Sequence, residues 1–296
     1  MNLKGKTVVL TGASRGIGRE ISQRFAKQGA NLIGIARSAP GLDRWKTDMT
    51  NLGIEARIVV FDLSQTEKLP ELAQAIEQKI KSLDSLQVDV LINNAAVEIY
   101  RAFQDYRLEE IKTIINVNLL SVMTLTHCLL PQLAPQGCIV NMASLAGKKS
   151  HPYDSAYAAS KAGLLMWSHS LRQEMAGSQQ TVSVVCPGYV ADSGMLVNTG
   201  IKSPWLAGRS QSSAVAEAVL KAVQTRQAEI IVNRDPITAA ITRIFLSIEQ
   251  LLPHFGDLSN RLLGITRLNQ QRVQSPPVSS HLIAQPVTCD SIASKS

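Results

Sequence analysis

The stretch TGASRGIG, Thr11–Gly18, decides the fold because it joins a strand-like run to a helix-like run. The apolar run KTVVL precedes it, and Ile17, Ile21 and Phe25 then repeat at helical spacing. Glycines at 12, 16 and 18 give a GxxxGxG spacing rather than GxGxxG. Such glycines let the backbone approach a pyrophosphate, whose charge the free N–H groups of a helix start stabilise. A plain strand-to-helix turn would not need three glycines, so the stretch predicts nucleotide binding.

Short β-branched runs alternate with longer helical patterns along the chain. This alternation is typical of βαβ units, so we predict an α/β fold with a doubly wound, seven-stranded parallel sheet. Ligands of such folds bind outside the carboxyl ends of the strands. The seven predicted strands are KTVVLTG (6–12), NLIGIAR (31–37), ARIVVFDL (56–63), VDVLINNA (88–95), GCIVNMAS (137–144), TVSVVCPG (181–188) and AEIIVN (228–233).

The composition fits one large α/β domain. The 296 residues are 45% hydrophobic, enough to bury a full core. The formal charge of +7 comes from scattered Lys and Arg, and no basic run or motif predicts nucleic-acid binding. The four cysteines have no CxxC or CxxH spacing, so we expect no metal site and no disulfide. The N-terminus enters a strand within six residues, which leaves no room for a signal peptide and predicts a reducing, cytoplasmic setting.

Tyr157 and Lys161 form a candidate catalytic pair. They are four residues apart in DSAYAASKAGLLMWSHSL, a segment long enough for a helix, so their side chains share one face. A neighbouring ammonium favours phenolate, and we expect it to lower the pKa of Tyr157 toward the range of general acid–base catalysis. Ser144 stands thirteen residues earlier at a predicted strand end. Turn capping is the alternative role for Ser144, since serine is common after strands.

Six motifs in the same order resemble the classical short-chain dehydrogenase/reductase family over about residues 1–233. They are TGxxxGIG from Thr11, NNAA from Asn93, NVNL with Asn118, NMAS with Ser144, YAASK from Tyr157 and CPGYV around Pro187. The resemblance implies a Rossmann-type fold, a nicotinamide cofactor, and hydride transfer to or from a carbonyl or alcohol.

The resemblance also implies roles for individual residues. The catalytic set would be Asn118, Ser144, Tyr157 and Lys161, with Asn118 holding a water through its backbone and Asn116 as the nearby alternative. Lys161 would also hold the nicotinamide ribose, Asp62 would contact the adenine ring, and Asn94 would line the adenosine ribose. The cofactor-binding set is Gly12, Ser14, Arg15, Gly16, Ile17, Gly18, Arg37, Asp62, Asn94, Tyr157, Lys161, Pro187, Gly188 and Val190.

The end of the second predicted strand favours NADP(H) over NAD(H). An acid at this point would bind the ribose 2′-hydroxyl of NAD, whereas an arginine can pair with the extra phosphate of NADP. The sequence IGIARSAPG provides Arg37 and no acid before Asp43, and Arg15 adds a second cation. One departure from the family is the position of its usual threonine after CPG, which Asp192 occupies with Ser193 next to it.

The segment 195–213, MLVNTGIKSPWLAGRSQSS, falls where the family has its substrate loop. Its apolar side chains suggest an apolar ligand, and packing against the core is the equally weighted alternative. These side chains are Met195, Leu196, Val197, Trp205 and Leu206.

We divide the chain into a catalytic domain at 1–233, an amphipathic helical extension at 234–268 and a disordered tail at 269–296. ITAAITRIFLSIEQLL places eight apolar residues on one helix face. Such a face can form a lid, a subunit interface or a membrane contact, and we favour packing near the cleft. Peripheral membrane contact is not favoured, because basic clustering is missing. The eight residues are Ile237, Ala240, Ile241, Ile244, Phe245, Ile248, Leu251 and Leu252.

The residues together predict an NADP(H)-dependent oxidoreductase that reduces a carbonyl, or oxidises the matching secondary alcohol, of an apolar small molecule. The alternatives are a catalytically idle NADP(H)-binding regulatory or scaffold protein and an NAD-linked alcohol dehydrogenase. A homo-oligomer, such as a dimer, is expected. His127, His151, His169 and His254 lack metal-ligand spacing and are assigned to the surface or to helix packing.

Overall fold

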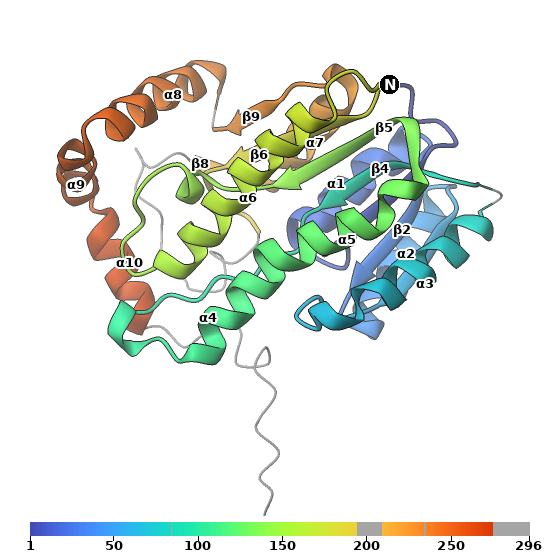
Figure 1. Cartoon of the computed structure of the whole chain (residues 1–296), viewed down its shortest axis with the longest axis horizontal. Coiled ribbons are helices and arrows are strands. Elements are labelled where there is room, and N and C mark those ends of the chain that lie inside the picture. The colour runs from blue at the N-terminus through green and yellow to red at the C-terminus, as the bar shows by residue number, and fades with distance from the viewer. Residues whose placement is uncertain (84, 194–208, 234, 275–296) are drawn as a thin grey trace, which may run out of the picture.

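The computed structural model describes residues 1–83, 85–193, 209–233 and 235–274 (Figure 1). Its centre is a seven-stranded parallel sheet in the order β3-β2-β1-β4-β5-β6-β9, which confirms the predicted doubly wound fold. The strands are β1 (Thr7–Thr11), β2 (Asn31–Ala36), β3 (Ala56–Val60), β4 (Val88–Asn93), β5 (Leu133–Met142), β6 (Thr181–Pro187) and β9 (Glu229–Val232).

Helices cover both faces of the sheet. On one face Phe25 of α1 and Trp45 of α2 share a cluster with residues of β1 and β2, and α7, which carries Val219 of the same cluster, packs beside β6. On the other face Ile76 of α3 and Leu125 of α5 share a second cluster, with α3 beside β2 and β3 and α5 beside β4. These elements are α1 (Gly16–Lys27), α2 (Ala39–Asn51), α3 (Leu69–Lys81), α4 (Leu108–Ile115), α5 (Ser121–Leu129), α6 (Ser155–Glu174) and α7 (Ser212–Thr225). Short helices are η1 (Thr66–Lys68), η2 (Phe103–Asp105), η3 (Asn116–Leu120), η4 (Leu130–Gln132) and η5 (Leu145–Gly147).

The helical run Leu108–Gln132 has a mean hydropathy of 1.5 over its most apolar window, and its length and composition would allow it to cross a membrane. It contains α4, η3 and α5. Val122, Leu125 and Leu129 of α5 are buried, and Leu125 and Leu129 belong to the cluster beneath the sheet. The apolar character of this run is therefore explained by packing in the core of the domain.

Two local features differ from the predicted strands. β5 begins at Leu133 rather than at residue 137, because Leu133 pairs with Val88 before a register shift that precedes the pairing of Cys138 with Val90. A second, two-stranded parallel sheet joins β7 (Tyr189–Val190) to β8 (Arg209–Ser210). This small sheet pairs the chain directly after β6 with the chain directly before α7, so its two strands flank residues 194–208 in the sequence.

The chain order reverses between β1 and β4, and this is where the cleft forms. β2 and β3 extend the sheet on one side of β1, and β4, β5 and β6 extend it on the other. The segments after β1 and β4 therefore separate at the carboxyl edge and leave a crevice between them. The glycine turn at 12–18 lies at this edge.

After β9 the chain forms three helices, α8 (Pro236–Leu251), α9 (Pro253–Leu262) and α10 (Ile265–Gln274). We call residues 235–274 the C-terminal arm. Figure 1 shows the arm running along one end of the molecule, from α8 beyond β9 to α10 near α4. α10 continues six residues past the predicted helical boundary at 268, because Leu268, Asn269 and Arg272 are buried against the domain.

The predicted packing of the apolar face of α8 near the cleft is wrong. Leu246 and Glu249, on the opposite side, are buried, and Ala239 adds a partly buried contact. The domain therefore contacts α8 through the side opposite the predicted apolar face. The helix that reaches the cleft is α10, through Arg272. Six of the eight predicted face residues are exposed large apolar side chains: Ile237, Ile241, Ile244, Ile248, Leu251 and Leu252.

Candidate active site

The glycine turn has the geometry of a close backbone approach. Gly12 has φ +70° and Gly16 has φ +55°, which L side chains rarely adopt. A Cβ on Gly18 would stand 2.0 Å from the carbonyl oxygen of Gly12, so only glycine lets the start of α1 lie this close to the end of β1. Ile17, the residue before Gly18, lines the pocket at this edge. This cradle fits a pyrophosphate next to the helix start.

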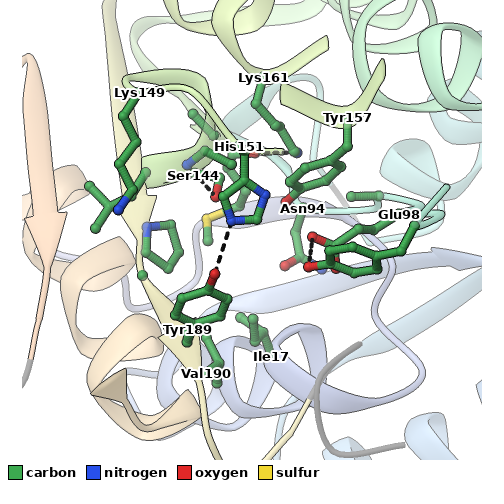
Figure 2. Close-up of a pocket in the computed structure, with 18 of the residues that line it drawn as sticks. Ile17, Asn94, Glu98, Ser144, Lys149, His151, Tyr157, Lys161, Tyr189 and Val190 are labelled. Atoms are coloured by element: carbon green, nitrogen blue, oxygen red, sulfur yellow. Dashed lines mark hydrogen bonds between the residues drawn. The ribbon is translucent and has the colours of Figure 1, made fainter. Parts of the chain in front are cut away.

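Ser144, Tyr157 and Lys161 meet in one pocket, as Figure 2 shows. Ser144 follows β5, while Tyr157 and Lys161 lie one turn apart on α6. The Lys161 Nζ lies 5.6 Å from the centroid of the Tyr157 ring and donates a hydrogen bond of 2.7 Å to the carbonyl of Met142. Ser144 Oγ accepts from the N–H of Ala146, so it caps the turn and also faces the pocket. Both roles considered for Ser144 are therefore present.

The expected lowering of the Tyr157 pKa is wrong in this structure. Burial raises the pKa of Tyr157 well above its ordinary value, and the nearby carboxyls of Glu98 and Asp154 raise it further. A hydrogen bond with Ser144 opposes the rise. Burial also lowers the pKa of Lys161, to about 8. Desolvation thus outweighs the ammonium, and Tyr157 holds its proton firmly at neutral pH.

Asn118 lies in a π-helical turn, η3, between α4 and α5. Its side chain is buried and fully occupied: Oδ1 accepts from the N–H of Val97, and Nδ2 donates to the Val97 carbonyl and to Ser160 Oγ. π-turns are rare and frequent at functional sites, because they displace backbone groups from their helical partners. Any water held at this position would therefore be bound by the backbone, and this role stays a prediction.

Four residues predicted to hold the adenosine end lie along the same carboxyl edge. Arg15 caps α1, and Arg37 follows β2 directly; both are exposed. Asp62 Oδ1, just after β3, accepts from the N–H of Ser64. Asn94, just after β4, donates through Nδ2 to the carbonyls of Thr11 and Gly12 and so ties β4 to the glycine turn. Ser14 approaches the start of α2 beside Gly41.

The end of β6 and the segment after it form another wall of the pocket, with Pro187, Gly188, Tyr189, Val190 and Ser193. Asp192 holds the start of α7, because its carboxylate accepts from the N–H and the hydroxyl of Ser212. Asp192 is therefore committed to the fold. Ser193 Oγ is buried without a hydrogen-bond partner within the described part of the chain. Of the two candidates for the missing threonine contact, Ser193 fits.

Six polar or aromatic side chains that were not predicted as site residues line the same pocket. They are Glu98, Tyr100, Lys149, His151, Tyr189 and Arg272. The signal available for Glu98 and Tyr100 was their place directly after NNAA, at a strand end. No local pattern marks Arg272, which is far along the chain on α10. The predicted loop residues Met195, Leu196, Val197, Trp205 and Leu206 lie outside the described residues.

His151 is not the surface or helix-packing residue that was expected. It is buried, its Nδ1 lies 3.1 Å from Asp154 Oδ2, and its Nε2 lies 2.9 Å from the hydroxyl of Tyr189. Burial lowers the pKa of His151 to about 3, helped by the charges of Lys149 and Arg272. His151 is therefore neutral at physiological pH and serves as a hydrogen-bonding link between α6 and β7.

Sequence comparison identifies relatives over most of the chain. A family model described as short chain dehydrogenase matches residues 6–203. Ketoacyl reductase HetN of Nostoc sp. is 43% identical over 275 residues, which are 92% of this chain and 94% of that protein. The 3-oxoacyl-[acyl-carrier-protein] reductase FabG of Escherichia coli is 33% identical over 192 residues, 64% of this chain and 75% of that protein.

Solved structures of similar fold include oxidoreductases that bind NADP or a derivative of it. A metagenomic short-chain oxidoreductase in complex with NADP is 28% identical, with a TM-score of 0.66, and the match covers 78% of this chain and 98% of that chain. An alcohol dehydrogenase from the archaeon Thermococcus sibiricus, complexed with 5-hydroxy-NADP, is 25% identical, with a TM-score of 0.67, covering 77% and 96%. The chain thus belongs to the short chain dehydrogenase family and is an oxidoreductase of CH–OH and C=O groups.

Proposed function

We propose that this chain reduces the oxo group of an oxoacyl compound with NADP(H), using Tyr157 as the general acid. The observation that carries the proposal is the convergence of Ser144, Tyr157 and Lys161 in one pocket beside the glycine turn. The similarity to a ketoacyl reductase supports the substrate class, and the NADP complexes of similar structures support the cofactor.

The residues present fit NADP(H). The turn at 12–18 and the start of α1 would hold the pyrophosphate, while Arg15 and Arg37 would pair with the 2′-phosphate. Asp62 and Asn94 would line the adenosine, and the unpartnered Ser193 Oγ would meet the nicotinamide amide. Lys161 would hold the nicotinamide ribose. When bound, the cofactor supplies the hydride.

The protein's own part in the reaction is to orient the carbonyl and to deliver a proton. Ser144 and Tyr157 donate hydrogen bonds to the carbonyl oxygen, on which negative charge develops during reduction. The raised pKa of Tyr157 keeps the phenol protonated and able to donate. As the proton moves to the substrate oxygen, the Lys161 ammonium stabilises the phenolate left behind. A water on the backbone of Asn118 would then reconnect the site with solvent.

The test is turnover by the purified full-length protein with a panel of oxoacyl esters, thioesters and acids, monitored by the absorbance of reduced nicotinamide. The expected result is oxidation of NADPH and a much weaker response with NADH. NADPH binding without turnover on any carbonyl or alcohol would support the idle regulatory alternative. Faster alcohol oxidation with NAD than carbonyl reduction with NADPH would support the alcohol dehydrogenase. The homo-oligomer and the cytoplasmic location stay predictions.

A further inference from the structure

Arg272 is a buried guanidinium in the wall of the pocket that holds Ser144 and Tyr157. The residue is 4% exposed and belongs to α10 of the C-terminal arm. Its guanidinium carbon lies 4.8 Å from the ring centroid of Tyr100 and 5.0 Å from that of Tyr189. Cation–π stacking on two rings fixes the plane of the guanidinium, so the side chain is held in place before a ligand arrives.

One edge of this guanidinium, next to Tyr189, has no hydrogen-bond partner among the described residues. Nη1 donates to the Tyr100 hydroxyl and, at 3.4 Å, to Asn269 Oδ1. Nε and Nη2 are buried and have no hydrogen-bond partner among the described residues. These two nitrogens form the fork whose parallel N–H groups match the two oxygens of a carboxylate. Buried donors without partners are costly, and two on one edge in a pocket call for an oxygen-bearing ligand.

The charges around the pocket favour an anion. Its lining contains three basic side chains, Lys149, Lys161 and Arg272, and one acid, Glu98. Glu98 accepts a hydrogen bond of 2.9 Å from the Tyr100 hydroxyl, which in turn accepts from Nη1 of Arg272. Glu98 is therefore linked to the Nη1 side of the guanidinium and not hydrogen-bonded to Nε or Nη2. Behind the lining, Asp154 is buried, and burial together with Glu98 raises its pKa, which favours the neutral acid.

We propose that Nε and Nη2 of Arg272 bind the carboxylate of an oxo-carboxylate, so that the enzyme selects oxoacyl substrates whose acyl end is a free acid. This proposal rests on the proposed reductase function. Arg272 is then a specificity-determining residue contributed by the arm. The oxo group and the carboxylate occupy the same pocket, and the spacing between Arg272 and Tyr157 selects the length of the carbon chain between them.

The experiment compares 4-oxopentanoate, 5-oxohexanoate and 6-oxoheptanoate with the methyl ester and the N-acetylcysteamine thioester of each. The ester and the thioester keep the oxo group and the chain but remove the charge. At the best chain length we expect kcat/KM for the acid to exceed that for both neutral forms by roughly 10- to 100-fold, the value of a charge-assisted pair of hydrogen bonds. Comparable rates for acid and thioester at every length would overturn the proposal.

Arg272→Gln should lower kcat/KM for the acid by roughly 10- to 100-fold, mainly through KM, and leave the ester within about twofold. Arg267→Gln is the matched control, since Arg267 is on the same helix but exposed. This variant should leave kcat/KM unchanged for both the acid and the ester. If Arg272→Gln does not fold, Arg272→Lys keeps the charge but loses the fork and should show a smaller loss for the acid. An equal loss for acid and ester would assign Arg272 a structural role only.

A binding measurement separates this proposal from the proposed function. Glutarate has no oxo group, so its effect on the melting temperature of the protein without cofactor reports anion binding alone. For the wild-type protein and the Arg267→Gln variant, we expect glutarate to raise the melting temperature more than dimethyl glutarate does. For the Arg272 variants, we expect glutarate to raise the melting temperature less than it does for the wild-type protein. If no carbonyl is reduced but this pattern holds, the reductase function fails and the anion site stands. If carbonyls are reduced and glutarate has no effect, the anion site fails alone.

Discussion

Two walls of the pocket differ in origin, one formed by the β5–α6 segment and one by the C-terminal arm. In the first, Tyr157 and Lys161 share a helix face because they are four residues apart, and any helix there would align them. In the second, Asn260 donates to Ser150 Oγ at 2.9 Å and Asn269 to the Pro152 carbonyl at 2.8 Å, across 110 and 117 residues of chain. The placement of Tyr157 and Lys161 depends on local spacing, whereas the placement of Arg272, the proposed substrate contact, depends on a few long-range hydrogen bonds.

The largest effect expected from the first wall is that of Tyr157→Phe. Losing the proton donor should reduce kcat by ~10²- to 10⁴-fold, the usual contribution of general acid–base catalysis. NADPH affinity should stay within about twofold of wild type, since the ring remains. Tyr153→Phe, four residues earlier, is the control. Single-turnover rates and titration of nicotinamide fluorescence measure both quantities, and a Phe variant that keeps most of its kcat would remove Tyr157 from the mechanism.

At the adenosine end of the cofactor site, outside both walls, Arg37→Asp should reverse the cofactor preference. The exposed guanidinium at the end of β2 is the expected partner of the 2′-phosphate, and an acid there repels it and accepts from a ribose hydroxyl instead. We expect the Kd for NADPH to rise by roughly 10- to 100-fold and the Kd for NADH to fall. Arg44→Asp, also exposed and on α2, carries the same charge change and should leave both values unchanged. Equal wild-type affinity for the two cofactors would contradict the role of Arg37.

The pH dependence tests whether Lys161 supports Tyr157. Burial lowers the pKa of Lys161 to about 8, so the ammonium is present below that pH and is lost above it. Reductive kcat/KM should therefore be flat below pH 8 and fall about tenfold per unit above it. His151, with a pKa of about 3, does not titrate in this range. Lys149 also has a lowered pKa, so the profile of Lys149→Met is the control and should match wild type. A profile with no break near pH 8 would count against Lys161.

The two walls also differ in how far the sequence predicts them. The seven parallel strands follow from periodicity, whereas the shared site of Ser144 and Tyr157 was implied by the family resemblance. The direction of the Tyr157 pKa shift did not follow, because it depends on burial and on Glu98 and Asp154, which only the folded chain brings close. His151 was misassigned for the same reason. Its partner Asp154 is near in the sequence, but its second partner, Tyr189, is brought close only by the folded chain.

The arm was the least predictable part. The hydrophobic pattern of α8 indicated which face is apolar but not what covers it, and Ile241 and Ile244 are in fact exposed. α10, which carries little apolar pattern, is the helix that docks, through Asn269, Arg272 and the small apolar contacts of Ile265 and Leu268. A polar helix that docks by hydrogen bonds to one backbone carbonyl and one tyrosine hydroxyl leaves no apolar periodicity in the sequence.

The smallest predicted effect is a rise in KM when the arm is loosened, and it tests whether the two walls act independently. The double variant Asn260→Ala and Asn269→Ala removes the hydrogen bonds that tie α9 and α10 to Ser150 and Pro152, each worth ~1 kcal/mol. Loosening the arm should raise KM for oxoacyl substrates by about 3- to 10-fold, because Arg272 loses its Asn269 contact and its fixed position.

In the same double variant NADPH affinity should stay unchanged, because the Asn260 and Asn269 contacts are on the substrate side of the pocket and not at the glycine turn. Gln270→Ala, an exposed change on the same helix, is the control for α10 itself. A matching rise in the Kd for NADPH would show that the arm shapes the cofactor site as well. The two walls would then be one cooperative unit rather than a locally encoded catalytic wall and a separately docked substrate wall.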